Sequence, residues 1–197
     1  MMRRLPILAT LLVFVAVGVM IALGFWQLDR RAQKEAMLAR YAVAQTLSAE
    51  VPWPVDPAGQ QAALFRRTTF ACQVVRKDMP IAGYDRSGTV GWAHSITCAL
   101  PNGARAEVVL GWTKDLAERQ WSGGTVTGVI APGAGHAVRL IADPPLAGLA
   151  ANALPDPKTI PNNHWSYAIQ WFLFAGVALI IYALALRKRL AVPGGEG

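Results

Sequence analysis

The chain has 197 residues, of which 53% are hydrophobic, and it carries a formal net charge of +7 at pH 7. This length provides enough residues for one domain with a core of its own. The basic residues of the central part occur in pairs such as Arg66-Arg67 and not as a stripe interleaved with aromatic residues, so nucleic acid is not expected as a partner.

The first predicted element is a transmembrane helix over residues 7–28, preceded by a short tail of residues 1–6. The range contains no Asp, Glu, Lys or Arg, and as a helix it would cover roughly 30 Å, enough to cross a bilayer. A cleaved signal peptide is the alternative. Its apolar region would usually be shorter, at about 7–15 residues, and it would end at an A-x-A motif, which is missing after this run. We therefore expect a retained anchor.

A central domain, residues 29–164, follows the first span. From Asp29 to Leu47 the chain is rich in Ala, Glu, Lys, Arg and Gln, which predicts that the first helix continues out of the membrane. Three prolines between residues 52 and 57 are expected to end this helix, because proline lacks a backbone N–H and fixes φ.

Beyond the prolines, the sequence predicts a mainly antiparallel sheet. Apolar residues alternate with polar or small ones in three runs, which contain Cys72, Ile96 and Val108. Pro101-Asn102-Gly103 is typical of a hairpin turn between the second run and the third. Two more short strands are expected near residues 125–130 and 137–141. Five short strands joined by turns favour a small barrel-like sheet, followed by an irregular return to the membrane from Pro144 to Pro161.

The second predicted span covers residues 165–186 and is followed by a tail, residues 187–197. Arg187-Lys188-Arg189 directly follows this span, and Arg3-Arg4 precedes the first one. Short flanks rich in Lys and Arg stay in the cytoplasm, whereas a long domain is translocated largely regardless of its charge. We therefore expect both tails in the cytoplasm and the central domain outside it.

The sequence lacks the motifs of common enzymes, and its two cysteines are not close enough for a redox motif. It contains no H-E-x-x-H, G-x-S-x-G, P-loop or G-x-G-x-x-G pattern, so no enzyme is indicated. Cys72 and Cys98 lie far apart in sequence, unlike the close pair of a copper chaperone or thiol oxidoreductase. Both occupy the apolar-facing register of a predicted strand. Buried thiols are the simpler expectation, and a disulfide, which persists outside the cytoplasm, is the alternative.

Two of the three histidines are not expected to bind a metal. His94 lies on the apolar face of a predicted strand, where a hydrogen-bonded core histidine is the ordinary case. His136 follows a Gly-Ala-Gly turn and is expected to be exposed.

His164 is different, because it directly precedes the second span. Helical spacing places Tyr167, Ala168 and Trp171 on the face that includes this histidine. An imidazole in such a place could hold haem iron, with the small Ala168 leaving room and the aromatic rings flanking a porphyrin. From the residues alone, an aromatic belt at the membrane interface with a solvated histidine is the simpler interpretation.

Two motifs, one at each span, carry a family resemblance. The first, at the end of the first span, is Gly24-x-Trp26-Gln27-x-x-Arg30-x-x-x-Lys34. The second, at the start of the second span, is Asn162-Asn163-His164-x-Ser166-Tyr167-Ala168-x-x-Trp171-Phe172. Both resemble motifs of the Surfeit locus protein 1 family, and Gly111-Trp112 is similar to that family's middle motif. The layout of two spans around one external domain also matches.

The resemblance implies an assembly factor for aa3-type cytochrome c oxidase, and not an enzyme. Bacterial members are associated with binding of haem a and its delivery to the catalytic subunit, so transiently bound haem a is the expected cofactor. The expected partners are that subunit, other assembly factors and membrane lipid. The expected location is the bacterial inner membrane, with the central domain in the periplasm. A cofactor-free membrane scaffold that stabilises an oxidase assembly intermediate is the alternative.

The resemblance also implies a haem site in which His164 is the iron ligand. Trp26 and Gln27 end the first span on the same side as His164, so the two motifs are expected to form one interhelical site. Trp26 could pack on the porphyrin or simply anchor the helix. Gln27 or Arg30 could reach a propionate or another polar substituent, although a solvated Arg30 is the simpler alternative. The predicted site residues are Trp26, Gln27, Arg30, His164, Tyr167 and Trp171.

Overall fold

The computed structural model describes residues 6–135 and 137–191, and of residues 75–77 it describes the backbone only. The elements are α1 (Ile7–Thr46), α2 (Pro57–Ala63), β1 (Arg67–Tyr84), β2 (Val90–Ala99), β3 (Arg105–Thr113), β4 (Gly124–Pro132), β5 (Val138–Ala142), the 3₁₀ helix η1 (Pro157–Thr159) and α3 (His164–Ala191). The chain divides into two compact units. The first consists of the described residues up to Met37 and from Pro161 onward, and the second is Leu38–Ile160.

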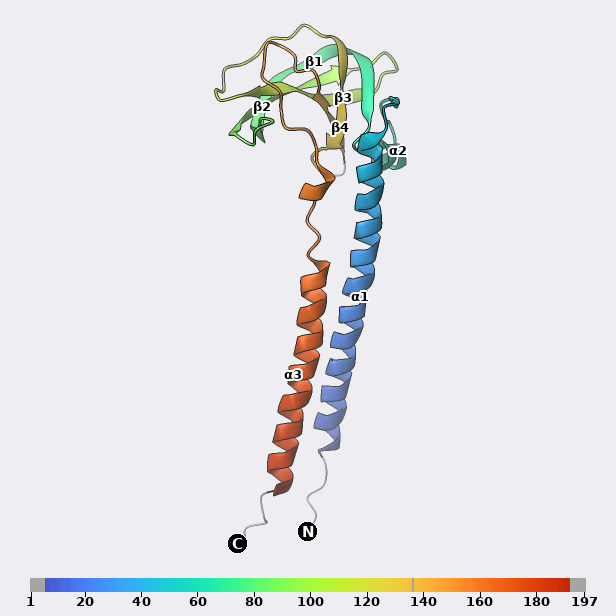
Figure 1. Cartoon of the computed structure of the whole chain (residues 1–197), viewed down its shortest axis with the longest axis vertical. Helices are drawn as coiled ribbons and strands as arrows, with labels where there is room; N and C mark the ends of the chain where they lie inside the picture. The colour runs from blue at the N-terminus through green and yellow to red at the C-terminus, as the bar shows by residue number, and fades with distance from the viewer. Residues whose placement is uncertain (1–5, 136, 192–197) are drawn as a thin grey trace. The chain divides into compact units, whose positions relative to one another are not determined.

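The first unit contains the two long apolar helices. Both α1 and α3 are long and apolar enough to cross a bilayer. α1 runs without a break to Thr46, so the helical segment expected from Asp29 onward is part of this helix. Within the first unit, α1 and α3 run antiparallel and side by side (Figure 1).

Small residues bring the two helices of the first unit together. A side chain on Gly24 would lie 2.6 Å from Cε1 of Phe172, so a larger residue would displace that ring. On α3, Ala168 and Ala175 are buried, with exposed fractions of 0% and 4%. Phe25 adds an edge-on contact with Phe172, with ring centroids 5.4 Å apart. Close approach through small residues is the usual packing of membrane helices.

The second unit is built on a closed five-stranded barrel with the strand order β1-β2-β3-β5-β4. Neighbouring strands are antiparallel except β3 and β5, which are parallel. The first part of β1 pairs with β4 and the second part pairs with β2, which lets one strand of 18 residues close the barrel. Two apolar helices flanking a mainly antiparallel barrel confirm the predicted fold class.

The predicted hairpin turn joins β2 to β3. The backbone N–H of Leu100 donates to the carbonyl of Ala104 at 2.9 Å, which closes the turn. Gly103 has a φ of +81° there, a conformation that glycine adopts more readily than other residues.

The barrel interior is filled by aliphatic side chains. Those with an exposed fraction of 0% are Val108, Leu110, Val126, Ile130 and Leu140. The alternation places Val109 on the other face of β3, yet its exposed fraction is only 1%. The reason is that the outer face of the barrel is covered here by the return segment, residues 144–161. Val109 forms a second apolar cluster on that face with Ala93, Ala131 and Ile141, against which Ile81 packs.

The sequence did not predict the two short helices, α2 and η1, since both begin at prolines that were expected to interrupt structure. Pro57 is the first residue of α2. A backbone N–H at this position would have no acceptor within the helix, so proline loses no hydrogen bond there. Oδ1 of Asp56 accepts the N–H of Gly59 at 2.8 Å and caps that helix, and Asp156 caps η1 in the same way. In both helices the aspartate directly before the proline supplies this cap.

Cys72 and Cys98 form a disulfide, with Cα atoms 5.1 Å apart. The expectation of two buried thiols is therefore wrong, although both residues are buried as expected. Cys72 pairs with Gly124 of β4, and the next residue of β1 already pairs with β2. The disulfide therefore fixes β1 at the point where the strand changes its partner.

Candidate functional site

His164 and Gln27 are hydrogen-bonded to each other across the two helices of the first unit. His164 is the first residue of α3, and its Nδ1 lies 2.7 Å from Oε1 of Gln27 on α1. An amide oxygen can only accept, so Nδ1 carries the proton and donates it to Gln27. In the neutral imidazole, Nε2 then holds the lone pair that a metal ion would use.

Trp26 and Arg30 pair with each other along α1. The guanidinium carbon of Arg30 lies 5.9 Å from the ring centroid of Trp26, and Nη1 of Arg30 donates to Gln33 at 3.0 Å. Half of the Trp26 side chain is exposed. Among the described side chains, neither Trp26 nor Arg30 is hydrogen-bonded to His164. The structure therefore separates the predicted residues of α1 into a direct partner of His164 and an exposed pair beside it.

The predicted residues of α3 do not enclose a space next to Ala168. Tyr167 is half exposed, and Trp171 is partly buried with its ring centroid 6.2 Å from that of Phe174. Ala168 itself has an exposed fraction of 0%. The room expected beside Ala168 is therefore filled by the helix contact, and that part of the prediction is wrong.

A second contact at the start of α3 was not predicted. The guanidinium carbon of Arg31 lies 4.8 Å from the ring centroid of Trp165, and its Nε donates to Glu35 at 2.7 Å. Arginine over an indole ring is a favourable cation–π contact. The available signal is that an arginine follows the first span and a tryptophan opens the second, at the same depth.

His94 is a buried residue of the barrel, as expected, but it has an unexpected partner. Its Nδ1 lies 2.6 Å from Oδ2 of Asp78, which also accepts the backbone N–H of Arg119 at 2.8 Å. The side chains of His94 and Asp78 are both fully buried, and Nε2 of His94 has no hydrogen-bond partner. The prediction for His136 lies outside the described residues. Within residues 6–135 and 137–191, no group of three or more His, Cys, Asp or Glu side chains could hold a metal ion.

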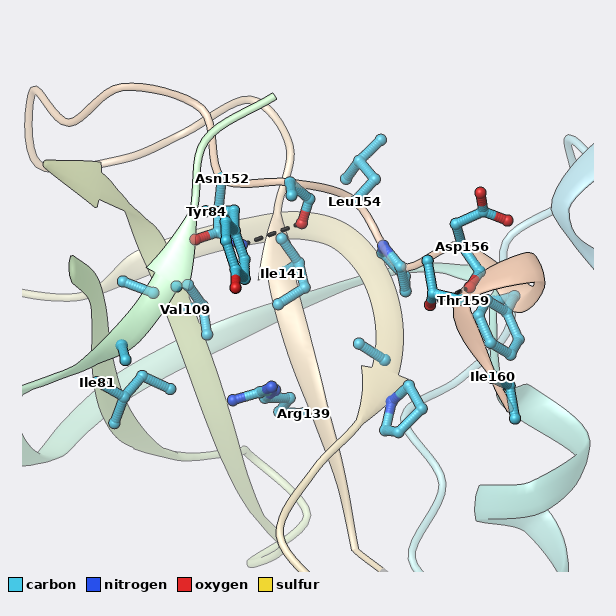
Figure 2. Close-up of a pocket in the computed structure, with 18 residues that line it drawn as sticks. Ile81, Tyr84, Val109, Arg139, Ile141, Asn152, Leu154, Asp156, Thr159 and Ile160 are labelled. Carbon is cyan, nitrogen blue, oxygen red and sulfur yellow. Dashed lines mark hydrogen bonds between the residues drawn. The ribbon is translucent and has the colours of Figure 1, made fainter. Parts of the chain in front are cut away.

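The second unit also contains a pocket of about 480 Å³ that the sequence did not predict (Figure 2). One wall is the outer face of the barrel, with Ile81, Val109 and Ile141, and the other is the return segment from Asn152 to Ile160. Figure 2 shows Asn152 and Arg139 on opposite sides of Ile141. No local sequence signal marks this pocket, because residues of all five strands and of the return segment meet only in the folded chain.

The chain was compared with known proteins. A family model described as the SURF1 family matches residues 14–176. This range includes both span motifs and the whole barrel, and the match confirms the resemblance to the Surfeit locus protein 1 family. No curated protein matches the chain.

Proposed function

The chain belongs to the SURF1 family, which is associated with cytochrome c oxidase assembly, and from this premise we propose that it binds haem a and assists its insertion into the catalytic subunit of an aa3-type oxidase. We assign it no catalytic activity of its own. Haem a is the cargo in this proposal, and the protein holds it only until the oxidase subunit takes it.

The hydrogen bond between His164 and Gln27 is the observation that supports this function best. Haem iron in proteins is often held by one imidazole nitrogen, and the other ring nitrogen usually donates to a carbonyl or carboxylate oxygen. The donor set at the start of α3 fits this pattern, because Oε1 of Gln27 accepts the hydrogen bond from the Nδ1–H and leaves Nε2 as the ligand atom.

The surrounding residues fit a flat apolar ligand with acidic groups. The half-exposed rings of Trp26 and Tyr167 offer apolar surface to a porphyrin, and Arg30 offers a cation to a propionate. We also assign Gln27 a role beyond the one that the sequence suggested, since its amide oxygen accepts the hydrogen bond from His164. Trp171 would contribute apolar surface one turn further into α3. A single histidine ligand also suits a protein that must release its cargo.

We further propose that this is an inner-membrane protein of a bacterium with both tails in the cytoplasm and the central domain in the periplasm. The basis is the run Arg187-Lys188-Arg189 at the end of α3, together with Arg3-Arg4 before α1. This orientation puts His164 at the periplasmic end of its span. A catalytic subunit in the same membrane, with other assembly factors, could then take the haem laterally.

The test is the haem content of the full-length protein, expressed in cells that synthesise haem a and purified in detergent. The wild-type protein should show haem absorbance, and His164→Ala should lose most of it. Gln170→Ala, an exposed change on the same helix, is the matched control and should keep the full haem content. Wild-type protein without haem that still restores oxidase assembly in a deletion strain would favour the cofactor-free scaffold. Full haem content in His164→Ala would remove the ligand role.

A further inference from the structure

The pocket of the second unit has the size and the apolar walls of a small-molecule site. Its volume of about 480 Å³ lies within the range of about 300–1,000 Å³ that is usual for ligand pockets. Ile81, Val109 and Ile141 line the barrel side, and Leu154 and Ile160 line the other. Leu154 keeps 39% of its surface exposed, so the apolar surface on that side remains open.

Arg139 supplies the charge of the pocket. It is the one cation among the described lining residues, and it lies two positions before Ile141 on β5. Its Nε is buried without a hydrogen-bond partner, and its Nη1 lies 4.0 Å from the carboxylate of Glu107, beyond hydrogen-bond distance. Glu107 is already engaged, since it accepts the hydroxyl of Ser95 at 3.0 Å. Arg139 therefore has only a long ion pair, with its register partner Glu107 on β3, and its Nε–H is left without an acceptor.

The other polar groups of the pocket do not compete for an anion. Oδ1 of Asp156 accepts the backbone N–H of Lys158 at 2.9 Å, and Figure 2 shows this carboxylate pointing away from Arg139. Nδ2 of Asn152 donates to the carbonyl of Ala153 at 3.0 Å, which leaves an acceptor oxygen at that end. An anion is therefore disfavoured beside Asn152 and favoured beside Arg139.

We propose that this pocket binds an apolar monocarboxylate of the fatty-acid class. The carboxylate pairs with Arg139 in the bidentate geometry that a guanidinium group favours. The hydrocarbon chain lies along Ile81, Val109 and Ile141. This site lies entirely within the second unit and does not depend on haem binding at His164.

The probe is octanoate, titrated by calorimetry into the full-length protein in phosphatidylcholine nanodiscs, with empty nanodiscs as the blank. Octanamide, which has the same chain and no charge, is the matched ligand. Octanoate should bind saturably and at least about tenfold more tightly than octanamide, because the amide cannot form the charge-assisted pair. No saturable octanoate binding above the blank, or equal binding of octanamide, would overturn the proposal.

Two variants locate the site. Arg139→Gln should weaken octanoate binding by about tenfold or more and leave octanamide unchanged. Leu154→Trp enlarges a partly exposed side chain of the pocket wall and should block both ligands, whereas Val90→Trp, on an exposed residue outside the pocket, should block neither. Unchanged octanoate binding in Arg139→Gln and Leu154→Trp would contradict the assignment. Equal melting temperatures of these variants and the wild type would show that any loss is not unfolding.

Discussion

Nδ1 of His164 lies 2.7 Å from Oε1 of Gln27, although the two residues are 137 positions apart in the chain. The contact joins the two span motifs that carry the family resemblance. It also determines which imidazole nitrogen holds the proton, so that Nε2 is the atom available to a metal. Gln27 therefore acts through His164 in our proposal, as a positioning residue.

Removing the acceptor of Gln27 should weaken haem binding without abolishing it. We expect Gln27→Leu to lower haem affinity about 10–100-fold, which is the usual effect of losing a hydrogen-bond partner of a metal-bound histidine. Gln27→Glu keeps an acceptor and should bind haem at least as well as the wild type. Titration of haem into the purified variants, followed by absorbance, measures both. Equal affinity of Gln27→Leu and wild type would show that the hydrogen bond does not support the ligand.

Replacing Gly24 should disturb the packing of the two helices. A Cβ at this position would lie 2.6 Å from the ring of Phe172, so Gly24→Val should destabilise the helix pair by about 1–3 kcal/mol. The melting temperature of the full-length protein in detergent measures this effect. Phe172→Ala removes the clashing ring, and in that background Gly24→Val should be much less harmful. If the double variant loses as much stability as the two single variants together, the close contact is not the cause of the loss.

Periodicity predicted the fold because the two kinds of element have different patterns in this chain. The spans are long runs without charge, and the strands alternate, so Val108 and Leu110 could be assigned to the barrel interior from sequence. The same alternation failed for Val109, because a sequence pattern shows which face of a strand is apolar but not whether a later segment covers the other face. The return segment also creates the pocket, which was therefore not predictable.

The candidate site was only partly predictable for a related reason. Helical spacing correctly placed Ala168 on the face of His164, but it could not show that the neighbouring helix fills the space there. It placed Gln27 at the right depth, and the structure was needed to show that its amide oxygen points at the imidazole. Asp78, the partner of His94, was missed because bulges in β1 break the alternation before it.

The buried pair of His94 and Asp78 should be important for the stability of the barrel. Asp78→Ala leaves the Nδ1–H of His94 and the backbone N–H of Arg119 without an acceptor. Since each buried unsatisfied donor costs about 1–3 kcal/mol, we expect a loss of roughly 3 kcal/mol in the free energy of unfolding. Chemical denaturation monitored by tryptophan fluorescence measures the change. Glu118→Ala, which removes an exposed carboxylate next to Arg119, is the control and should have a much smaller effect. Equal effects of the two variants would contradict this role.

Asp143 should make stability depend on pH. Burial raises the pKa of its carboxyl, but hydrogen bonds and charge from Arg67 and Arg86 outweigh burial and hold that pKa below the ordinary value of 3.8. A lowered pKa in the folded state stabilises the protein above pH 3.8, and this contribution is lost as the pH falls through the folded-state pKa. Asp143→Asn should therefore lower stability near pH 6, by about 1 kcal/mol or less because both arginines are partly exposed.

The measurement for Asp143 is the melting temperature between pH 6 and about pH 3, with the variant and wild type in the same detergent. The difference between them should shrink as the pH falls below the ordinary aspartate pKa. Glu118→Gln removes an exposed carboxylate and should show no such trend. A difference that stays constant over the whole range would show that the effect of Asp143→Asn is steric and not electrostatic.

The disulfide between Cys72 and Cys98 should contribute strongly to the stability of the barrel. It closes a loop with a sequence separation of 26, for which chain entropy predicts roughly 3.5 kcal/mol of stabilisation. The double variant Cys72→Ser, Cys98→Ser should lose about this amount in chemical denaturation. Treatment of the wild type with reductant under denaturing conditions should increase its mass by about two daltons, which tests the bond directly.

The position of the disulfide predicts which part of the barrel is affected most by its loss. The bond lies where β1 changes its partner from β4 to β2, so its loss should open the barrel at this corner first. Hydrogen exchange of the double variant should therefore rise most at the Cys72–Gly124 and Val74–Cys98 pairs. The parallel contact between β3 and β5 should keep its protection. A uniform rise across all five strands would show that the disulfide acts only on the unfolded chain, since a purely entropic effect of the loop has no preferred place in the folded barrel.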